Sequence, residues 1–324
     1  MGFFLGLYLS FAGPRTAFPQ TVETPLVHSL PIDVDHKQPE RTDFGSLKLL
    51  SAFHLQSNDR RFGGLSGLSI SADAKLYAIS DRGHWLSAAM STDGNGALLK
   101  LVDWRIAPIL SAAKKPVRGR LADAEALTRT ADGSFLVAFE GAHRIWRYPA
   151  PPETFRSAPS RVGIPSPLLR APSNEGVEGL TMLPDGRLLA LTEGFENPDR
   201  SFKGWLIDKD QSWELSYAPA RGFRVTDCAA LENGDVLVLE RRYVRFGILS
   251  ARITMIKADS LKPGARLVGK QLIKLEQPLA AENYEAIAVQ RTRQGTALFI
   301  ASDDNYGWFQ QTLLLQFLLP STDN

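Results

Sequence analysis

The chain of 324 residues contains a single cysteine, Cys228, and only five histidines. One cysteine excludes an intrachain disulfide and a cysteine-rich metal site, and we expect Cys228 to be a small buried residue of a strand. The net charge is +2, with acidic and basic residues interspersed. This argues against nucleic-acid binding, because a nucleic-acid surface needs clustered lysine and arginine.

Familiar catalytic motifs are also missing. The sequence has no Gly-x-Ser-x-Gly segment, no phosphate-binding glycine loop and no His-Glu-x-x-His motif, so the usual serine-hydrolase, P-loop and zinc-protease sites are not indicated. Ser66 lies in Gly64-Leu65-Ser66-Gly67, which resembles a nucleophile segment only loosely. We expect Ser66 to occupy a position that glutamate fills in other parts of the chain.

Long hydrophobic runs are scarce, and the clearest lies at residues 2–13. It is too short to span a bilayer comfortably and resembles the apolar part of a secretory signal, although no basic residues precede it. We therefore expect residues 1–17 to be a signal peptide or an uncleaved anchor, and the protein to be periplasmic or secreted, with no other stable membrane span. Residues 18–43 are polar and aperiodic and indicate a linker, which leaves residues 44–320 for one folded domain.

One short pattern recurs five times: an acidic or small polar residue, a hydrophobic pair, a turn, an apolar run and a second acidic residue. The hydrophobic anchor residues of successive copies lie 51 to 59 residues apart. A period near fifty in a strand-rich sequence is typical of a β-propeller. The copies begin at Gly64, Asp123, Gly176, Asp227 and Asn283, and they end at Asp81, Glu140, Glu193, Glu240 and Asp303.

Each copy predicts one four-stranded blade. Asp132-Gly133, Asp185-Gly186 and Asn233-Gly234 separate apolar runs and indicate hairpin turns. A third strand follows each hairpin, as at residues 144–148, and a fourth precedes the next copy, as at 167–170. The last copy has only three strands, so we expect residues 45–55 to supply its fourth and close the ring, which removes a free sheet edge. The predicted fold is an all-β propeller of five blades; a sixth, degenerate blade is the alternative.

The repeat should bring acidic side chains together. The first and last residues of a hairpin are neighbours, so Glu125 should lie near Glu140, and Glu178 near Glu193, all at one mouth of the central channel. Crowded carboxylates repel one another, and either a calcium ion or the arginines Arg82 and Arg241 can offset them. The alternative is that these acids are solvated turn residues or hold neighbouring blades through backbone amides.

Other residues invite less specific interpretations. His84 and His143 follow the acid-bearing strands of the first two copies. One interpretation is a base at the channel, but we expect both to be exposed loop histidines. Most of the tryptophans should be packing residues, and Trp85, beside Asp81 and Arg82, is the one that a ligand site would use.

Six phrases of the repeat stand out: Phe62-Gly63-Gly64-Leu65-Ser66-Gly67-Leu68, Ile79-Ser80-Asp81-Arg82-Gly83, Asp123-Ala124-Glu125-Ala126-Leu127, Asn174-Glu175-Gly176-Val177-Glu178-Gly179-Leu180, Leu239-Glu240-Arg241 and Asn283-Tyr284-Glu285-Ala286-Ile287. Taken together, they resemble the phytase-like bacterial family described by an esterase-like activity of phytase, over roughly residues 45 to 318. The resemblance implies a propeller with phosphoesterase or esterase activity, often exported, and by analogy with β-propeller phytases a calcium ion that holds phosphate. The chain has Ser66 and Ala229 where the other copies have glutamate, so the acidic ring is incomplete.

The leading hypothesis is a calcium-dependent phosphoesterase that acts on a small anionic substrate at the channel mouth. In it Arg82 and Arg241 bind the anionic group, and Glu140 or Glu193 accepts a proton from water. The alternatives are a non-catalytic binding propeller and a metal-dependent lactonase or carboxylesterase. The expected calcium ligands are Glu125, Glu178, Glu285 and Asp227.

Overall fold

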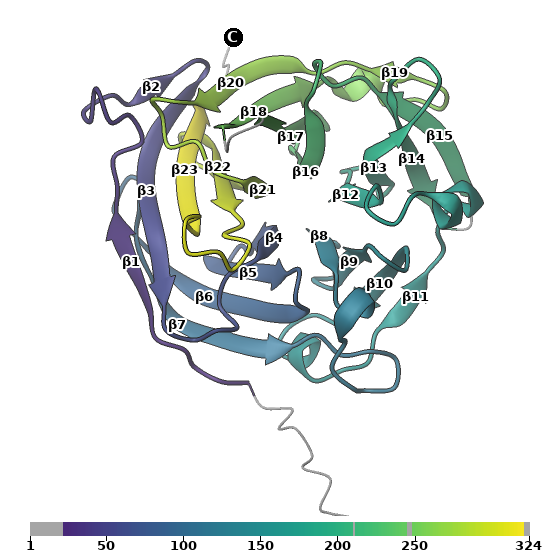
Figure 1. The fold of residues 1–324 in the computed structure, drawn as a ribbon, viewed down its shortest axis with the longest axis horizontal. Coiled ribbons are helices and arrows are strands. Elements are labelled where there is room, and N and C mark those ends of the chain that lie inside the picture. Colours follow the sequence, from purple (N-terminus) through teal and green to yellow (C-terminus); the bar gives the residue numbers. More distant parts are fainter. Residues whose placement is uncertain (1–21, 210, 245–247, 321–324) are drawn as a thin grey trace, which may run out of the picture.

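A computed structural model describes residues 22–209, 211–244 and 248–320. In these residues five small sheets stand in a ring around a central opening, with the first strand of each repeated segment innermost (Figure 1). The predicted five-bladed β-propeller is therefore confirmed. The expected signal peptide or anchor, residues 1–17, lies outside the described residues. No helix in the described part is long and apolar enough to cross a bilayer.

The blades are consecutive along the chain. Blade 1 contains β4 (Leu65–Ile70), β5 (Lys75–Ser80), β6 (His84–Thr92) and β7 (Leu98–Pro108). Blade 2 contains β8 (Ala124–Arg129), β9 (Phe135–Phe139), β10 (Arg144–Tyr148) and β11 (Ser160–Val162). Blade 3 contains β12 (Val177–Met182), β13 (Leu188–Glu196), β14 (Phe202–Asp208), β15 (Gln211–Tyr217) and the parallel edge strand β19 (Arg266–Leu267).

Blade 4 contains β16 (Arg224–Ala230), β17 (Val236–Val244), β18 (Ile248–Ile256) and β20 (Lys270–Glu276). Blade 5 contains β21 (Tyr284–Thr292), β22 (Gly295–Ser302), β23 (Leu313–Pro320), β3 (Leu47–Ser57) and β1 (Val27–Pro31), and β2 (Asp43–Phe44) pairs with β3. Four short 3₁₀ helices occur in the described connections: Gly119–Leu121, Glu153–Phe155, Ser166–Arg170 and Ala258–Ser260.

The ring closes as the sequence predicts, because β3 from the N-terminal part pairs antiparallel with β23. Two local expectations differ from the structure. Residues 167–170 belong to a 3₁₀ helix, and the outer strand of blade 2 is β11 instead. The expected linker of residues 18–43 includes β1, which pairs with β3 on the outside of blade 5, so this segment extends the last sheet.

The hairpin turns form because glycine supplies a backbone conformation that other residues avoid. Gly133 has φ +82° and Gly186 has φ +89°, in the region that L side chains rarely adopt. The amide of Gly133 donates to the carbonyl oxygen of Thr130 at 2.9 Å, and the amide of Gly186 donates to that of Leu183 at 2.9 Å. These turns fix the register of β8 with β9 and of β12 with β13.

Apolar side chains between neighbouring blades make up the core. Trp85 of blade 1 packs against Phe135 and Tyr148 of blade 2, with ring centroids 5.6 and 5.3 Å apart. All three rings are fully buried, so Trp85 is a packing residue and not part of a ligand site. Cys228 is buried as well, as the sequence predicts.

Every innermost strand contains the same irregularity. The pairing register shifts by one residue at Ser66 in β4, and the equivalent shift recurs in β8, β12, β16 and β21. Such a β-bulge sets two residues against one on the partner strand and re-aims a side chain. The bulge residues are Ser66, Glu125, Glu178, Thr226 and Glu285.

Candidate functional site at the channel mouth

The bulge residues divide into two chemical kinds. Blades 2, 3 and 5 have glutamate at the bulge, whereas blades 1 and 4 have a hydroxyl residue. The hydroxyl of Ser66 donates to the carbonyl oxygen of Ala124 in blade 2. The hydroxyl of Thr226 donates to the carbonyl oxygen of Tyr284 in blade 5 at 3.1 Å. The hydroxyl bulges therefore connect adjacent blades, and Ser66 is neither free nor placed as a nucleophile.

A second set of equivalent positions follows the next strand of each blade. In blade 2 the amide of Glu140 donates to the carbonyl oxygen of Asp123, two residues before the bulge, at 2.9 Å. The equivalent backbone hydrogen bond, from an amide to the residue two before the bulge, identifies Asp81, Glu193 and Asp303 as the corresponding residues of blades 1, 3 and 5. In blade 4, where Arg224 pairs with Arg241, the equivalent residue is Arg241, so this second ring has four acids and one arginine.

The predicted alignment of the fourth copy was wrong. Thr226, and not Ala229, occupies the glutamate position, and Arg241, and not Glu240, occupies the acid position. Glu240 is fully buried inside blade 4, where it accepts a hydrogen bond from Tyr217 and pairs with Arg252 at 2.5 Å. A usable signal was present, because Glu125 and Glu178 each lie eight residues before a turn glycine, and the same count from Gly234 gives Thr226.

Arg241 supplies a positive charge to one side of the mouth. Its guanidinium donates to Glu285, to Asn283 Oδ1 at 2.5 Å and to Glu193 Oε1 at 3.3 Å. Burial alone would lower the pKa of Arg241, but the charges of Glu285, Glu178 and Glu193 outweigh it and raise the pKa. The side of the mouth between blades 3 and 5 is thus partly neutralised by the chain itself.

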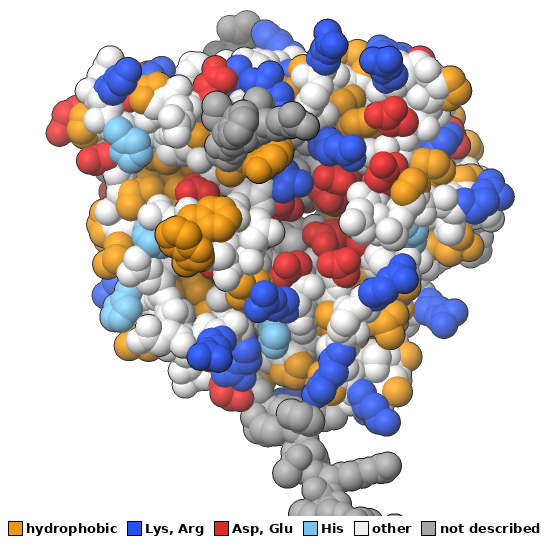
Figure 2. Space-filling view, in the orientation of Figure 1, with side chains coloured by type: hydrophobic (Ala, Val, Ile, Leu, Met, Phe, Trp, Pro, Cys, Tyr) orange, Lys and Arg blue, Asp and Glu red, His pale blue; other side chains and the backbone are white. Residues whose placement is uncertain are grey.

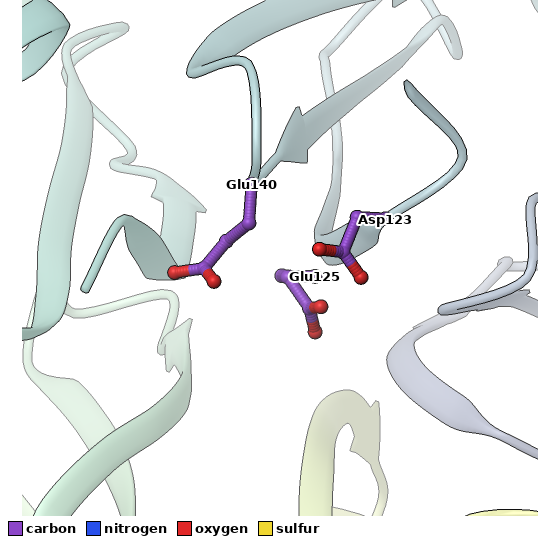
Figure 3. A group of neighbouring side chains, drawn as sticks. All are labelled: Asp123, Glu125 and Glu140. Carbon is purple, nitrogen blue, oxygen red and sulfur yellow. The ribbon is translucent and has the colours of Figure 1, made fainter. Parts of the chain in front are cut away.

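The side formed by blade 2 has no such counter-ion in contact with it, although the charges of Arg144 and Asp123 interact. Carboxylate oxygens of Asp123, Glu125 and Glu140 all lie within 4.8 Å of one another, and Figure 3 shows the three side chains reaching into the same space. Within the part of the chain that the structure describes, none of the three forms an ion pair with lysine or arginine. Figure 2 shows red acidic side chains in the central hollow of this face, with blue basic side chains around it.

Burial makes these negative charges costly. It raises the pKa of Glu140 to about 8, even though the amide of Gly176 donates to Glu140 Oε1 at 2.5 Å. The pKa of Glu125 is raised well above its usual range, first by burial and then by the charges of Glu285 and Asp123. A proton or a cation must therefore accompany these carboxylates at neutral pH.

A further buried acid indicates a cation more directly. Glu178 is only 6% exposed, and its Oε2 has no hydrogen-bond partner. Burial, followed by the charges of Glu193 and Glu285, raises the pKa of Glu178 well above the usual value. Asp81 Oδ1 is likewise buried without a partner, and burial raises the pKa of Asp81 to about 6. Ligands that are all oxygen, several of them unsatisfied, fit a hard cation such as calcium.

The structure gathers most of the predicted site residues, with two exceptions. Asp227 is fully buried beside the bulge of blade 4, where its two oxygens accept the amides of Cys228 at 2.7 Å and Ile287 at 2.8 Å. These contacts explain Asp227 as a connection between blades 4 and 5. Arg82 is exposed, with its guanidinium 3.5 Å from the ring centroid of Tyr306, and it lies near the acids without forming an ion pair among the described residues.

Glu193 lies between two arginines, since Arg224 and Arg241 approach its oxygens at 3.4 and 3.3 Å. Burial raises its pKa although both arginines lower it. Asp123 completes the blade 2 group, although the sequence had not assigned it as a metal ligand. Asp123 lies two residues before Glu125, and residues two apart in a regular strand point to the same side. This spacing could have indicated Asp123 as a ligand.

Several solved structures resemble this one at low sequence identity. The PQQ-bound form of aldose sugar dehydrogenase from Streptomyces coelicolor is 14% identical, with 86% of this chain and 99% of that chain covered and a TM-score of 0.46. The allergen Mala s 1 from Malassezia sympodialis is 16% identical, with 89% and 95% covered and a TM-score of 0.45. Virginiamycin B lyase from Staphylococcus aureus is 10% identical, with 91% and 100% covered and a TM-score of 0.40.

No curated protein matches the chain. The phytase-like family model, described as "Esterase-like activity of phytase", matches residues 60–306. This match includes the five bulge residues and all the carboxylates of the channel mouth. The chain therefore belongs to the phytase-like family.

Proposed function

We propose that this protein is a calcium-dependent hydrolase of a small phosphoester, with the cation held by Asp123, Glu125 and Glu140. One observation carries the proposal: three carboxylates with oxygens within 4.8 Å of one another lack a basic partner in the described chain. Calcium takes six to eight oxygen ligands, so backbone oxygens and water would complete the set. This ligand group keeps Glu125 from the set expected from the sequence, but not Glu285, which Arg241 already neutralises, or Asp227, whose oxygens accept backbone amides. Glu178, whose buried Oε2 has no hydrogen-bond partner, would supply a further oxygen from the neighbouring blade.

When bound, calcium would polarise the ester and lower the pKa of water at the site. The residues of the chain have separate tasks. Arg82, exposed and without an ion pair among the described residues, attracts and orients the anionic group of the substrate. Glu193, whose pKa is raised by burial, accepts a proton from water, since a base works best with a pKa near the operating pH. Arg241 holds Glu193 in place.

The test is a set of assays on the purified full-length protein with and without EDTA. Suitable substrates are p-nitrophenyl phosphate, bis-p-nitrophenyl phosphate and phytate. We expect phosphoester turnover that EDTA abolishes and calcium restores, and that Glu125→Gln abolishes as well. Glu232→Gln is the matched control, because Glu232 is an exposed acid that pairs with Arg291 far from the mouth. Turnover that EDTA and Glu125→Gln leave unchanged would contradict the proposal.

Two alternatives make different predictions in the same experiment. A metal-dependent lactonase or carboxylesterase would use the same cation to polarise a carbonyl group, so it would turn over a lactone or p-nitrophenyl acetate but not the phosphoesters. A non-catalytic binding propeller is favoured by Arg241, which neutralises part of the ring without any ligand. It would gain thermal stability with calcium and show no turnover of any of these esters.

We also propose that the protein acts in the periplasm or outside the cell. The support is the apolar run at residues 2–13, which resembles the hydrophobic part of a secretory signal. N-terminal sequencing of protein expressed from the full reading frame, after cell fractionation, tests this location. Recovery in the cytoplasmic fraction with an intact N-terminus would contradict it.

A further inference from the structure

A cavity of about 600 Å³ opens beside the acidic mouth, against the loop that follows Glu140. We call it the Arg144 pocket. Its volume is within the range of about 300–1,000 Å³ that is usual for small-ligand sites. Arg120, Arg144 and Arg161 line it, and no aspartate or glutamate of the described chain does. Trp146, Ile145 and Val162 contribute an apolar wall.

Arg144 is the arginine of this pocket with an unsatisfied hydrogen-bond donor. Its guanidinium carbon lies 3.9 Å from the ring centroid of Phe139 and 4.3 Å from that of Trp146. Two of its nitrogens donate to the carbonyl oxygens of Ala142 and Leu121, at 2.9 and 2.5 Å. Its Nε is buried and has no hydrogen-bond acceptor.

The charge of Arg144 is compensated only in part, by the charge of Asp123. It forms no ion pair with a carboxylate of the described chain, and burial lowers its pKa to about 10. A half-buried cation without an ion-pair partner is costly, and the aromatic contacts offset part of the cost. Each terminal nitrogen of Arg144 carries two N–H groups and donates one of them to a backbone oxygen, so an anion in the pocket would accept the remaining ones. Guanidinium groups bind carboxylate, sulfate and phosphate in this way.

We propose that the Arg144 pocket is a binding site for a flat organic anion, an aromatic ring that carries a carboxylate, sulfate or phosphate group. The anionic group lies against Arg144 and Arg161, and the ring packs on the apolar wall that includes Trp146. The mixture of arginine and apolar side chains suits neither a neutral ring nor a small, fully hydrated anion. This binding does not depend on the proposed hydrolysis, because the metal ligands are not part of the pocket.

Isothermal titration of the EDTA-treated full-length protein tests the proposal, since binding at the cation site is then absent. The probe is 2-naphthoate, with 2-naphthalenemethanol as the neutral ring and acetate as the anion without a ring. We expect one 2-naphthoate per chain, bound at least about tenfold more tightly than either control compound. Equal binding of the neutral alcohol would overturn the proposal, because the pocket would then be an apolar crevice only.

Variants locate the binding site. Arg161→Met removes an exposed guanidinium of β11 and should weaken 2-naphthoate binding about tenfold without affecting folding. Arg144→Met should weaken it further, with circular dichroism as a check on folding. Arg147→Met is the matched control, because Arg147 lies on the same strand but pairs with Asp132 outside the pocket. Unchanged binding in Arg161→Met and in folded Arg144→Met would overturn the proposal.

Discussion

Arg241 of blade 4 donates a hydrogen bond to Glu285 of blade 5. The two form an ion pair at the channel mouth, with side chains only 22% and 11% exposed. Arg241 stands where the other four blades have an acid. This one basic residue offsets part of the repulsion between the acids of the ring, so fewer bound cations are needed to balance their charge. The channel mouth therefore has two different sides. Arg241 neutralises acidic charge on one side, and no lysine or arginine of the described chain pairs with Asp123 on the other.

The first prediction concerns this pair. Arg241→Gln should lower the free energy of unfolding by about 3–5 kcal/mol, because it leaves Glu285 buried without its counter-ion and Glu193 with only the exposed Arg224. Calcium should recover more stability in the variant than in the parent protein, since a cation can then occupy the vacated space. Thermal unfolding with calcium and with EDTA measures both effects.

Arg224→Gln is the control for this variant. Arg224 approaches the same Glu193 but is largely exposed, and an exposed ion pair contributes only about 0–1 kcal/mol. A loss of equal size in the two variants would mean that the Arg241 pair has no special role.

The second prediction concerns pH. Burial raises the pKa of Glu140 from 4.5 to about 8 and, with the charge of Glu285, raises that of Asp303 from 3.8 to about 8. The folded protein therefore holds these protons more tightly than the unfolded chain does between pH 4.5 and 8. The stability that these two groups contribute in EDTA is fully present below this window and falls as the pH rises through it, by up to about 1.4 kcal/mol per pH unit for each group.

Calcium should remove most of this loss, because a cation favours the ionised carboxylates and its affinity rises with pH. Chemical denaturation from pH 5 to 8, in EDTA and in calcium, checks the prediction. Glu140→Gln in EDTA should have a flatter profile than the parent protein, since glutamine does not titrate. A profile that rises with pH in EDTA would contradict the raised pKa values.

Much of the fold follows from local sequence signals. The turn glycines, such as Gly133 and Gly186, are required by their positive φ angles, so they mark the hairpins and with them the blades. The missing fourth strand of the last copy predicts its pairing with an N-terminal strand, and β3 supplies it. The first inference depends on the positive φ angle that glycine allows, and the second on the four strands that each blade of the ring requires.

The site was less predictable because a bulge interrupts the alternation of a strand. The segment Asp227-Cys228-Ala229-Ala230 has nearly the same pattern of polar and apolar residues as Asp123-Ala124-Glu125-Ala126. This similarity placed the start of the fourth copy at Asp227, three residues after Arg224, which is the true equivalent of Asp123. Counting from the turn glycine would have avoided this, since Gly234 is fixed by its own φ angle. No local signal shows that the side chain of Asp227 bonds to the amide of Ile287, because that contact joins two blades.

The third prediction tests this role of Asp227. Asp227→Asn should cost about 1–3 kcal/mol of stability, because one of its oxygens becomes an amide group that faces a backbone N–H and leaves that donor unsatisfied. The bound calcium per chain should stay the same. Denaturant unfolding together with elemental analysis measures the two quantities, and a loss of calcium in a folded Asp227→Asn variant would restore Asp227 as a ligand.

The fourth prediction distinguishes the two possible ligand sets at the mouth. Asp123→Asn should weaken calcium binding by at least about tenfold, since it removes charge and an oxygen ligand from the blade 2 group. Glu285→Gln should leave calcium affinity within about threefold, but lower stability by about 1–3 kcal/mol because Arg241 loses the nearer of its two carboxylate partners. Calorimetric titration with calcium and denaturant unfolding of both variants provide the measurements. The opposite pattern, with calcium binding lost in Glu285→Gln and kept in Asp123→Asn, would return the cation to Glu125, Glu178 and Glu285 and make Asp123 an ordinary solvated acid of the rim.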